Sequence, residues 1–183
     1  MKNQNFKFQS DVMKKNLVLL GMMGVGKTTL GKILANKYKY NFIDIDSNIE
    51  KKNLMSINEI FEKKGENFFR IEEEKITLNS LDKKNCIIAL GGGAFTNEKI
   101  REKVLNLSIS IWLNADIDLI SKRLKKNVKR PLLKNKNIKK KLNELYAKRK
   151  NIYNLANYKV DCDKLSIKEV VKKIMTIYEY DKR

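Results

Sequence analysis

The residues whose types and spacing most directly suggest chemistry form the stretch from Gly21 to Thr28, which reads GMMGVGKT. Glycines carry no Cβ, so a glycine-rich backbone can wrap closely around phosphate oxygens. The N–H groups of such a loop, with those of the helix that follows it, form a positive nest for phosphate. Lys27 then reaches the β- and γ-phosphates, and the Thr28 hydroxyl binds the accompanying Mg2+. The pattern predicts a loop that holds the phosphates of ATP.

Both flanks of this loop have the composition that a phosphate-binding loop requires. The apolar run Leu17–Leu20 precedes it, and Leu30, Ile33 and Leu34 fall on one face of a helical pattern after it. Strand, glycine loop and helix in this order favour the functional interpretation over a glycine turn that matches by chance. The residues predicted to contact the nucleotide here are Gly21, Met22, Met23, Gly24, Val25, Gly26, Lys27, Thr28 and Thr29.

Acidic residues and glycines follow the next two predicted strands. Asp44 and Asp46 close the second strand-like run, and alternate residues of an extended segment point the same way, so both carboxylates are expected to face the site. The alternative is that either aspartate is a helix N-cap, a common role after a strand. Gly91, Gly92 and Gly93 end the third strand-like run and allow a ligand to approach the backbone closely.

Two arginines, Arg70 and Arg149, are candidates for binding an anionic substrate. Arg70 has Glu73 at i+3 to hold it, and Arg149 has Tyr153 one turn further on. A planar guanidinium matches a carboxylate fork, so paired arginines suit an acidic substrate. Taken singly, Arg70 with Glu73 would be a surface helix pair, and Arg130, beside several lysines, would be a solvated side chain.

The elements that must position these residues alternate between strand-like and helical runs. The predicted strands are Asn16–Leu20, Asn41–Asp44, Cys86–Leu90, Ser108–Leu113 and Tyr158–Asp161. A last helix runs from Ser166 to about Tyr180, with a capping box formed by Ser166 and Glu169. This alternation predicts an α/β fold with a parallel sheet covered on both faces. Ligands bind such sheets outside the carboxyl ends of the strands, where the motifs lie.

Two segments interrupt the simple alternation. Residues 46–81 are almost entirely helix-like and are predicted to form a helical flap over the substrate. Residues 125–137 are polar, contain Arg130 and Pro131, and are predicted to form a mobile lid. Residues 1–13 are predicted to be a polar tail, and residues 14–183 a single domain.

Composition narrows the classes of protein. No apolar stretch among the 183 residues approaches the ~20 residues of a membrane span, and the N-terminus lacks the apolar core of a secretory signal. Cys86 and Cys162 lie far apart in the sequence and form no disulfide framework, which favours the reducing cytoplasm. With no histidine in the chain, any general base must be a carboxylate, Lys, Cys or Tyr.

The net charge of +19 raises the alternative of nucleic-acid binding. Lysine and asparagine are abundant throughout the chain, and no recognised nucleic-acid motif accompanies them. We therefore expect no specific nucleic-acid partner and no membrane partner. The positive field still favours anionic ligands such as ATP and carboxylates.

Taken together, and in this order along the chain, these motifs resemble the shikimate kinase family from about Lys14 to the last helix. The resemblance implies a three-layer αβα P-loop kinase with a five-stranded parallel sheet of order 2-3-1-4-5. It implies transfer of the γ-phosphate of ATP to the 3-hydroxyl of shikimate, with Mg2+, in aromatic amino-acid biosynthesis. A cytoplasmic monomer is expected.

The resemblance also implies roles for single residues. Asp46 matches the aspartate that binds the shikimate hydroxyls and acts as base, and Asp44 the one that holds Mg2+ through water. Arg70 and Arg149 match the pair that grips the shikimate carboxylate, with Gly91, Gly92 and Gly93 beside the substrate. Arg130 matches the lid arginine that moves onto the transferring phosphate, and Arg123 one that stacks near adenine. Lys27, Asp46 and Arg130 are thus the predicted catalytic residues.

Two alternatives stay open at this point. Another small-metabolite kinase, such as a gluconate kinase, would have no reason for two carboxylate-gripping arginines. A non-catalytic binder of nucleotide or nucleic acid would have no reason to keep Lys27, Asp46 and Arg130. The third strand ends in glycines, where many P-loop enzymes have an aspartate, so Mg2+ must rely on Thr28 and Asp44.

Overall fold

The computed structural model describes residues 15–126 and 138–181. Five parallel strands form one sheet of order β2-β3-β1-β4-β5, which confirms the predicted sheet and its order. The strands are β1 (Asn16–Leu20), β2 (Asn41–Asp44), β3 (Cys86–Ala89), β4 (Ser108–Asn114) and β5 (Tyr158–Asp161). β3 is one residue shorter and β4 one residue longer than the sequence predicted, while the other three have the predicted bounds.

The central strand β1 sets the position of the phosphate-binding loop. All five of its residues are buried, as expected for a parallel strand covered on both faces. Its residue Leu19 pairs with Ala89 of β3, and Leu20 pairs with Trp112 of β4. The loops after β1 and β3 therefore leave the sheet side by side at its carboxyl edge.

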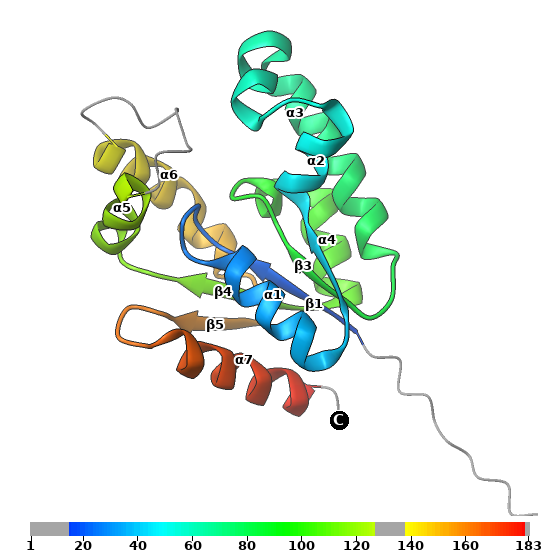
Figure 1. The fold of residues 1–183 in the computed structure, drawn as a ribbon, viewed down its shortest axis with the longest axis vertical. Helices are drawn as coiled ribbons and strands as arrows, with labels where there is room; N and C mark the ends of the chain where they lie inside the picture. Colours follow the sequence, from blue (N-terminus) through cyan, green and yellow to red (C-terminus); the bar gives the residue numbers. More distant parts are fainter. Residues whose placement is uncertain (1–14, 127–137, 182–183) are drawn as a thin grey trace, which may run out of the picture.

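Helices cover both faces of the sheet (Figure 1). α1 (Lys27–Tyr38) and α7 (Ile167–Asp181) pack together on one face, and α4 (Glu98–Leu107) lies on the other, after the short 3-10 helix η1 (Ala94–Thr96). Glu169 N–H donates to Ser166 Oγ at 3.3 Å and Ser166 N–H to Glu169 Oε2 at 2.7 Å. These two bonds confirm the predicted capping box of the last helix.

The predicted helical flap consists of α2 (Ile45–Asn53) and α3 (Ile57–Leu81), which rise above the sheet edge in Figure 1. α3 begins with a capping box between Ser56 and Glu59. Gly65 interrupts α3 with φ 80° and ψ 168°, outside the helical region, so the helix is kinked there. The kink separates the outer turns of α3 from the turns that carry Arg70 and Glu73.

The helices next to the predicted lid are α5 (Ile117–Lys126) and α6 (Ile138–Tyr153). The predicted lid began at residue 125, whereas α5 continues through Lys126. Residues 127–137, with Arg130, lie outside the described residues, as does the predicted tail 1–13. Within the described ranges, no helix is long and apolar enough to cross a membrane.

Candidate active site

The loop after β1 has the backbone conformation that the glycine pattern predicted. Gly21, Gly24 and Gly26 have φ of 135°, 77° and 111°, a region that favours glycine. A Cβ at position 21 would also collide with the carbonyl oxygen of Leu113. Gly26 is the N-cap of α1 and brings no side chain to cap it. The first N–H groups of the helix therefore face the loop, as a phosphate site requires.

Lys27 and Thr28 follow this loop at the start of α1. Lys27 Nζ donates to the carbonyl oxygens of Gly21 at 2.9 Å and Met22 at 3.1 Å, so the ammonium group lies over the loop. The Thr28 hydroxyl donates to Asp44 Oδ2 at 2.6 Å. A hydroxyl and a carboxylate thus meet where the phosphate-binding loop faces the end of β2.

The structure corrects the prediction that Asp44 and Asp46 share one extended segment. α2 begins at Ile45, so Asp46 stands in the first helical turn. Asp44 is the N-cap, and its Oδ1 accepts from Ser47 N–H at 3.2 Å, which was the alternative considered from sequence. Asp44 can serve both as the N-cap of α2 and as a residue of the predicted site, because its Oδ2 faces Thr28. Both aspartates line the same cavity despite the different backbone conformation.

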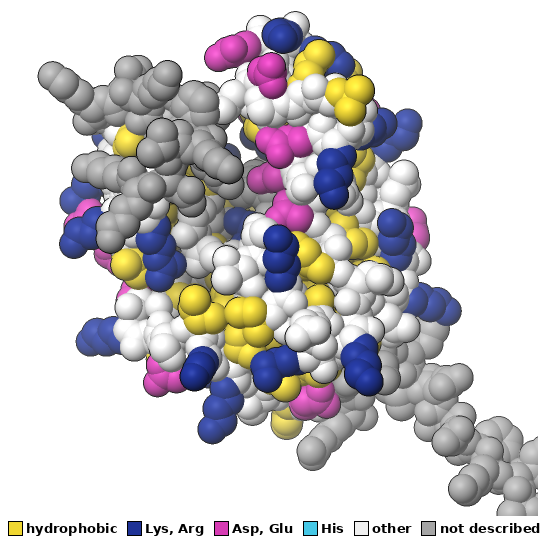
Figure 2. Space-filling model, viewed as in Figure 1, with side chains coloured by type: hydrophobic (Ala, Val, Ile, Leu, Met, Phe, Trp, Pro, Cys, Tyr) yellow, Lys and Arg dark blue, Asp and Glu magenta, His cyan; other side chains and the backbone are white. Residues whose placement is uncertain are grey.

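This cavity has a volume of about 440 Å³ and lies between the phosphate-binding loop, the flap and the glycines after β3. Figure 2 shows acidic side chains gathered below the flap, beside the hollow, while lysines and arginines are scattered over the rest of that face. The lining residues are Met23, Thr28, Asp44, Asp46, Ser47, Glu50, Ser56, Ile57, Asn58, Phe61, Phe69, Arg70, Glu73, Gly92, Gly93 and Arg149.

The glycine triplet after β3 lies where the charged groups converge. A Cβ at position 91 would collide with Glu73 Oε1 and lie 2.7 Å from Asp46 Oδ1. At position 93 it would lie 2.6 Å from Arg70 Nη1, and at position 92 it would be 3.5 Å from Arg149 Nη1. The structure therefore brings Asp46, Arg70 and Arg149 together around the triplet, from three separate helices.

Arg70 is held by two glutamates of its own helix. Its Nη1 donates to Glu73 Oε2 at 2.7 Å, the i+3 pair expected from sequence, and its Nη2 donates to Glu66 Oε1 at 3.0 Å. Glu73 is 2% exposed, and its Oε1 accepts no hydrogen bond from the described residues. Burial raises the pKa of Glu73, and the neighbouring Arg70 opposes that rise. The site thus contains a buried carboxyl group that sequence reasoning treated only as a partner for Arg70.

Several lining residues had no part in the sequence prediction. Glu50 accepts from Ile57 N–H at 3.0 Å, which ties α2 to the start of α3. Phe61 and Phe69 form a ring pair with centroids 4.8 Å apart at the cavity wall. The kink in α3 at Gly65 lets Phe61 of the outer turns meet Phe69, which precedes Arg70. No sequence signal indicates that kink beyond a single glycine.

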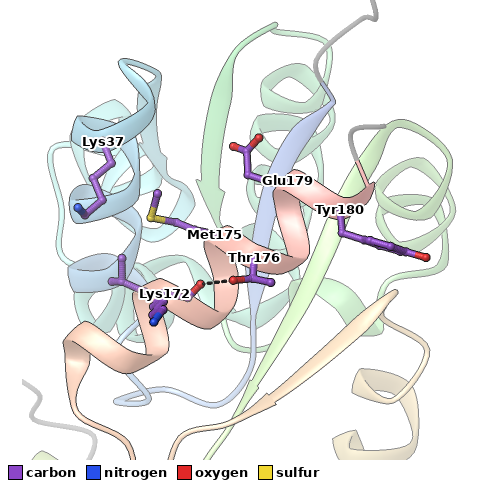
Figure 3. Close-up of a pocket in the computed structure, with 7 residues that line it drawn as sticks. Lys37, Lys172, Met175, Thr176, Glu179 and Tyr180 are labelled. Carbon is purple, nitrogen blue, oxygen red and sulfur yellow. Dashed lines mark hydrogen bonds between the residues drawn. The ribbon is translucent and has the colours of Figure 1, made fainter.

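Arg123 lies outside this cavity, on α5. Its Nη1 donates to the carbonyl oxygen of Val25 at 3.3 Å, so it contacts the phosphate-binding loop from another side. A second hollow, of about 550 Å³, lies between α1 and α7 (Figure 3). It contains none of the predicted site residues, and Thr176 there donates to Lys172 O of its own helix at 3.1 Å.

Comparisons with known proteins agree with this geometry. The sequence profile described as shikimate kinase matches residues 23–179. A shikimate kinase of Bacillus subtilis is 42% identical over 173 residues, covering 93% of this chain and 92% of its own. One of a Sulfurihydrogenibium species is 38% identical over 162 residues, covering 88% and 96%. The structure resembles that of Acinetobacter baumannii shikimate kinase in complex with shikimate, with a TM-score of 0.86, 33% identity, and 91% and 94% of the two chains covered.

Proposed function

This chain belongs to the shikimate kinase family, and we propose on that premise that its cleft transfers the γ-phosphate of ATP to the 3-hydroxyl of shikimate. The products are 3-phosphoshikimate and ADP. One observation carries the proposal: two guanidinium groups and a carboxylate surround Gly91–Gly93 in a cavity that also includes Met23 and Thr28. A hydroxylated carboxylic acid and the phosphates of ATP therefore fit side by side.

The acceptor side of the cleft suits shikimate in its charge and its polar groups. Arg70 and Arg149 bind the carboxylate through charge-assisted hydrogen bonds, and Arg70 is pre-oriented by Glu73. Asp46 lies near Gly91, close to the ion pair of Arg70 and Glu73. Its carboxylate accepts a hydrogen bond from the reacting hydroxyl, directs the oxygen toward the phosphate, and can take its proton.

The nucleotide side is the phosphate-binding loop with Lys27. Its backbone N–H groups bind the phosphate oxygens, and Lys27 exchanges its bonds to two loop carbonyls for bonds to the β- and γ-phosphates. Arg130 neutralises charge on the transferring group, and Arg123 contributes beside the adenine. These two assignments rest on the sequence resemblance, together with the contact between Arg123 and the loop.

Thr28 and Asp44 are the residues that would hold Mg2+. Their oxygens are 2.6 Å apart, and oxygen donors are what this ion prefers. Among the described residues, no group of three or more acidic, Cys or His side chains could hold a metal. This fits an ion held by few protein groups together with phosphate and water. When bound, Mg2+ neutralises negative charge on the β- and γ-phosphates.

The reaction asks the protein for positioning and charge neutralisation more than for covalent chemistry. The cleft offers both, since the acceptor and the phosphates are held by different elements that meet at one sheet edge. We also propose that the chain works as a monomer without a specific nucleic-acid partner, and that residues 14–183 act as one domain.

The direct test is ADP release by the full chain with Mg-ATP, with and without shikimate. We expect release that depends on shikimate, and 3-phosphoshikimate as the product. Gluconate and other hydroxy acids serve as competing substrates in the same assay. Turnover with gluconate but not shikimate would assign the chain to the gluconate kinase alternative. Nucleotide binding without turnover of any acceptor would favour a non-catalytic binder.

A further inference from the structure

Tyr153 ends α6 and lies beneath the site, and it is not among the residues that line the cavity described above. Its side chain is 1% exposed, and its ring packs against Trp112 of β4 with centroids 5.9 Å apart. Trp112 pairs in the sheet with Leu20, the residue before the phosphate-binding loop. Trp112 Cδ1 also lies 3.5 Å from the position of a Cβ on Gly21. The ring of Tyr153 therefore packs against Trp112, which itself lies next to the first glycine of the phosphate-binding loop.

The hydroxyl group of Tyr153 contacts both the glycine triplet on the acceptor side of the cleft and the phosphate-binding loop on the nucleotide side. It donates a hydrogen bond to the carbonyl oxygen of Gly92, and it lies 3.9 Å from Met22 Sδ in the phosphate-binding loop. Burial raises the pKa of Tyr153 while the neighbouring Arg149 guanidinium opposes that rise, and the hydroxyl keeps the proton that it donates. One turn earlier on the same helix is Arg149, whose Nη1 approaches Gly92 from the cavity side.

We propose that Tyr153 is a positioning residue that fixes the distance between Arg149 and the phosphate-binding loop. This inference rests on the proposed function, in which Arg149 holds the acceptor and the loop holds the phosphates. The hydroxyl binds the end of α6 to the Gly92 carbonyl and contacts Met22 of the phosphate-binding loop. Reacting atoms must approach to about 3–3.5 Å, and a misplacement of about 1 Å can reduce the rate about 100-fold. A tyrosine beneath the site therefore acts on turnover without touching either substrate.

The competing explanation is that Tyr153 only fills the core. A second buried tyrosine, far from the site, provides a matched control for that explanation. Tyr178 of α7 is fully buried, and its hydroxyl donates to the carbonyl oxygen of Lys15 at 2.7 Å. Lys15 precedes β1, so this bond lies at the amino edge of the sheet, opposite the site. Tyr153→Phe and Tyr178→Phe each remove one buried hydroxyl bound to a backbone carbonyl, and both keep the aromatic ring.

The experiment compares kcat, both KM values, the Kd for ATP and the melting temperature in wild type and the two variants. We expect Tyr153→Phe to lower kcat at saturating substrates about 10- to 100-fold, with the Kd for ATP within about twofold of wild type. We expect the two variants to have similarly lowered melting temperatures, and Tyr178→Phe to keep the kcat of wild type. Equal kcat values in both variants, with similar losses of melting temperature, would overturn the proposal. Absence of shikimate-dependent turnover in the wild type would instead refute the proposed function.

A second variant keeps the test decisive if Tyr153→Phe does not fold. Trp112→Phe keeps the Tyr153 hydroxyl but weakens the packing against the Tyr153 ring. We expect its kcat to fall by less than tenfold, yet clearly below that of Tyr178→Phe. A Trp112→Phe enzyme with the kcat of Tyr178→Phe would overturn the positioning role.

Discussion

Asp46 stands in the first turn of α2, beside Gly91 and close to the ion pair of Arg70 and Glu73. Asn keeps the shape of Asp and one acceptor oxygen but cannot take a proton. If proton acceptance matters in the transition state, Asp46→Asn should lose about 10²–10⁴-fold in turnover. If transfer is largely dissociative, positioning dominates, so Asn retains more activity while Asp46→Ala loses most of it.

The measurement for Asp46 is kcat of both variants at saturating ATP and shikimate, with the Kd for ATP as the control. ATP affinity should stay near wild type, because the phosphate-binding loop is unchanged. A crippled Ala variant beside a fairly active Asn variant would make Asp46 a positioning group. Near-wild-type turnover of Asp46→Ala would exclude both roles.

Arg149 is expected to act on the acceptor alone, since its guanidinium lies at Gly92 and lines the cavity. Arg149→Ala should weaken shikimate binding by about 1.5–3 kcal/mol, roughly ten- to a hundredfold, as for a charge-assisted hydrogen bond. Titration calorimetry with shikimate and with ATP separates the two sides of the cleft. Lys148→Ala removes the neighbouring exposed charge of α6 and should change neither affinity. A defect confined to ATP would show that Arg149 was assigned to the wrong ligand.

Glu73 should make stability depend on pH. Burial raises its pKa above the ordinary 4.5, so the folded state holds the proton more tightly than the unfolded chain does. The resulting stabilisation is present below the unfolded pKa and is lost as pH rises through the folded pKa. From about pH 4.5 upward, wild type should therefore lose free energy of unfolding relative to Glu73→Gln.

Urea unfolding of both proteins across this pH range tests the Glu73 prediction. Glu66→Gln is the matched control, because it removes the exposed partner of the same arginine, Arg70. A free-energy difference between wild type and Glu73→Gln that stays constant with pH, or that changes in the opposite direction, would contradict the prediction.

Among the elements, α3 depends on its kink. Gly65 has φ 80° and ψ 168°, and a Cβ there would meet no atom within 4 Å, so the cost of substitution is backbone strain alone. Gly65→Ala should reduce the free energy of unfolding by about 1–3 kcal/mol, or straighten the helix to relieve the strain. Straightening would part Phe61 from Phe69 and raise the KM for shikimate.

Urea unfolding and shikimate kinetics together test the role of this kink. Glu62→Ala, on the exposed side of the same helix, should stay within about 0.5 kcal/mol of wild type. A Gly65→Ala protein with unchanged stability and unchanged KM would mean that the kink is not required for the cavity.

For the whole molecule, the net charge of +19 is the property that most favours the alternative of nucleic-acid binding. On the face in Figure 2 the basic side chains are scattered and do not form one stripe. We expect duplex DNA to bind weakly and to lose affinity steeply between about 50 and 200 mM salt. Fluorescence anisotropy with duplexes of unrelated sequence measures this. Tight, sequence-selective binding at physiological salt would revive the nucleic-acid alternative.

The sequence by itself determined the strands, the helical flap, the last helix and the list of chemical groups. Strand-like runs of four to six residues between helical patterns predicted the five parallel strands, and three of the five had the predicted bounds. The phosphate-binding loop could be predicted because its glycines and its flanks are consecutive in the chain. The i+3 pair of Arg70 and Glu73 and the capping box of α7 are likewise local.

Tertiary structure decided what depends on residues far apart in the chain. The extended backbone predicted for Asp44 and Asp46 was wrong, because the chain enters a helix at Ile45 and the Thr28 hydroxyl bonds the Asp44 side chain, but both carboxylates line the cavity as expected. The burial of Glu73 and the bond from Tyr153 to Gly92 arise where α3, α6 and the β3 loop meet. Local pattern identifies which groups are present, but burial and distance are set by packing between elements, which no short stretch of sequence encodes.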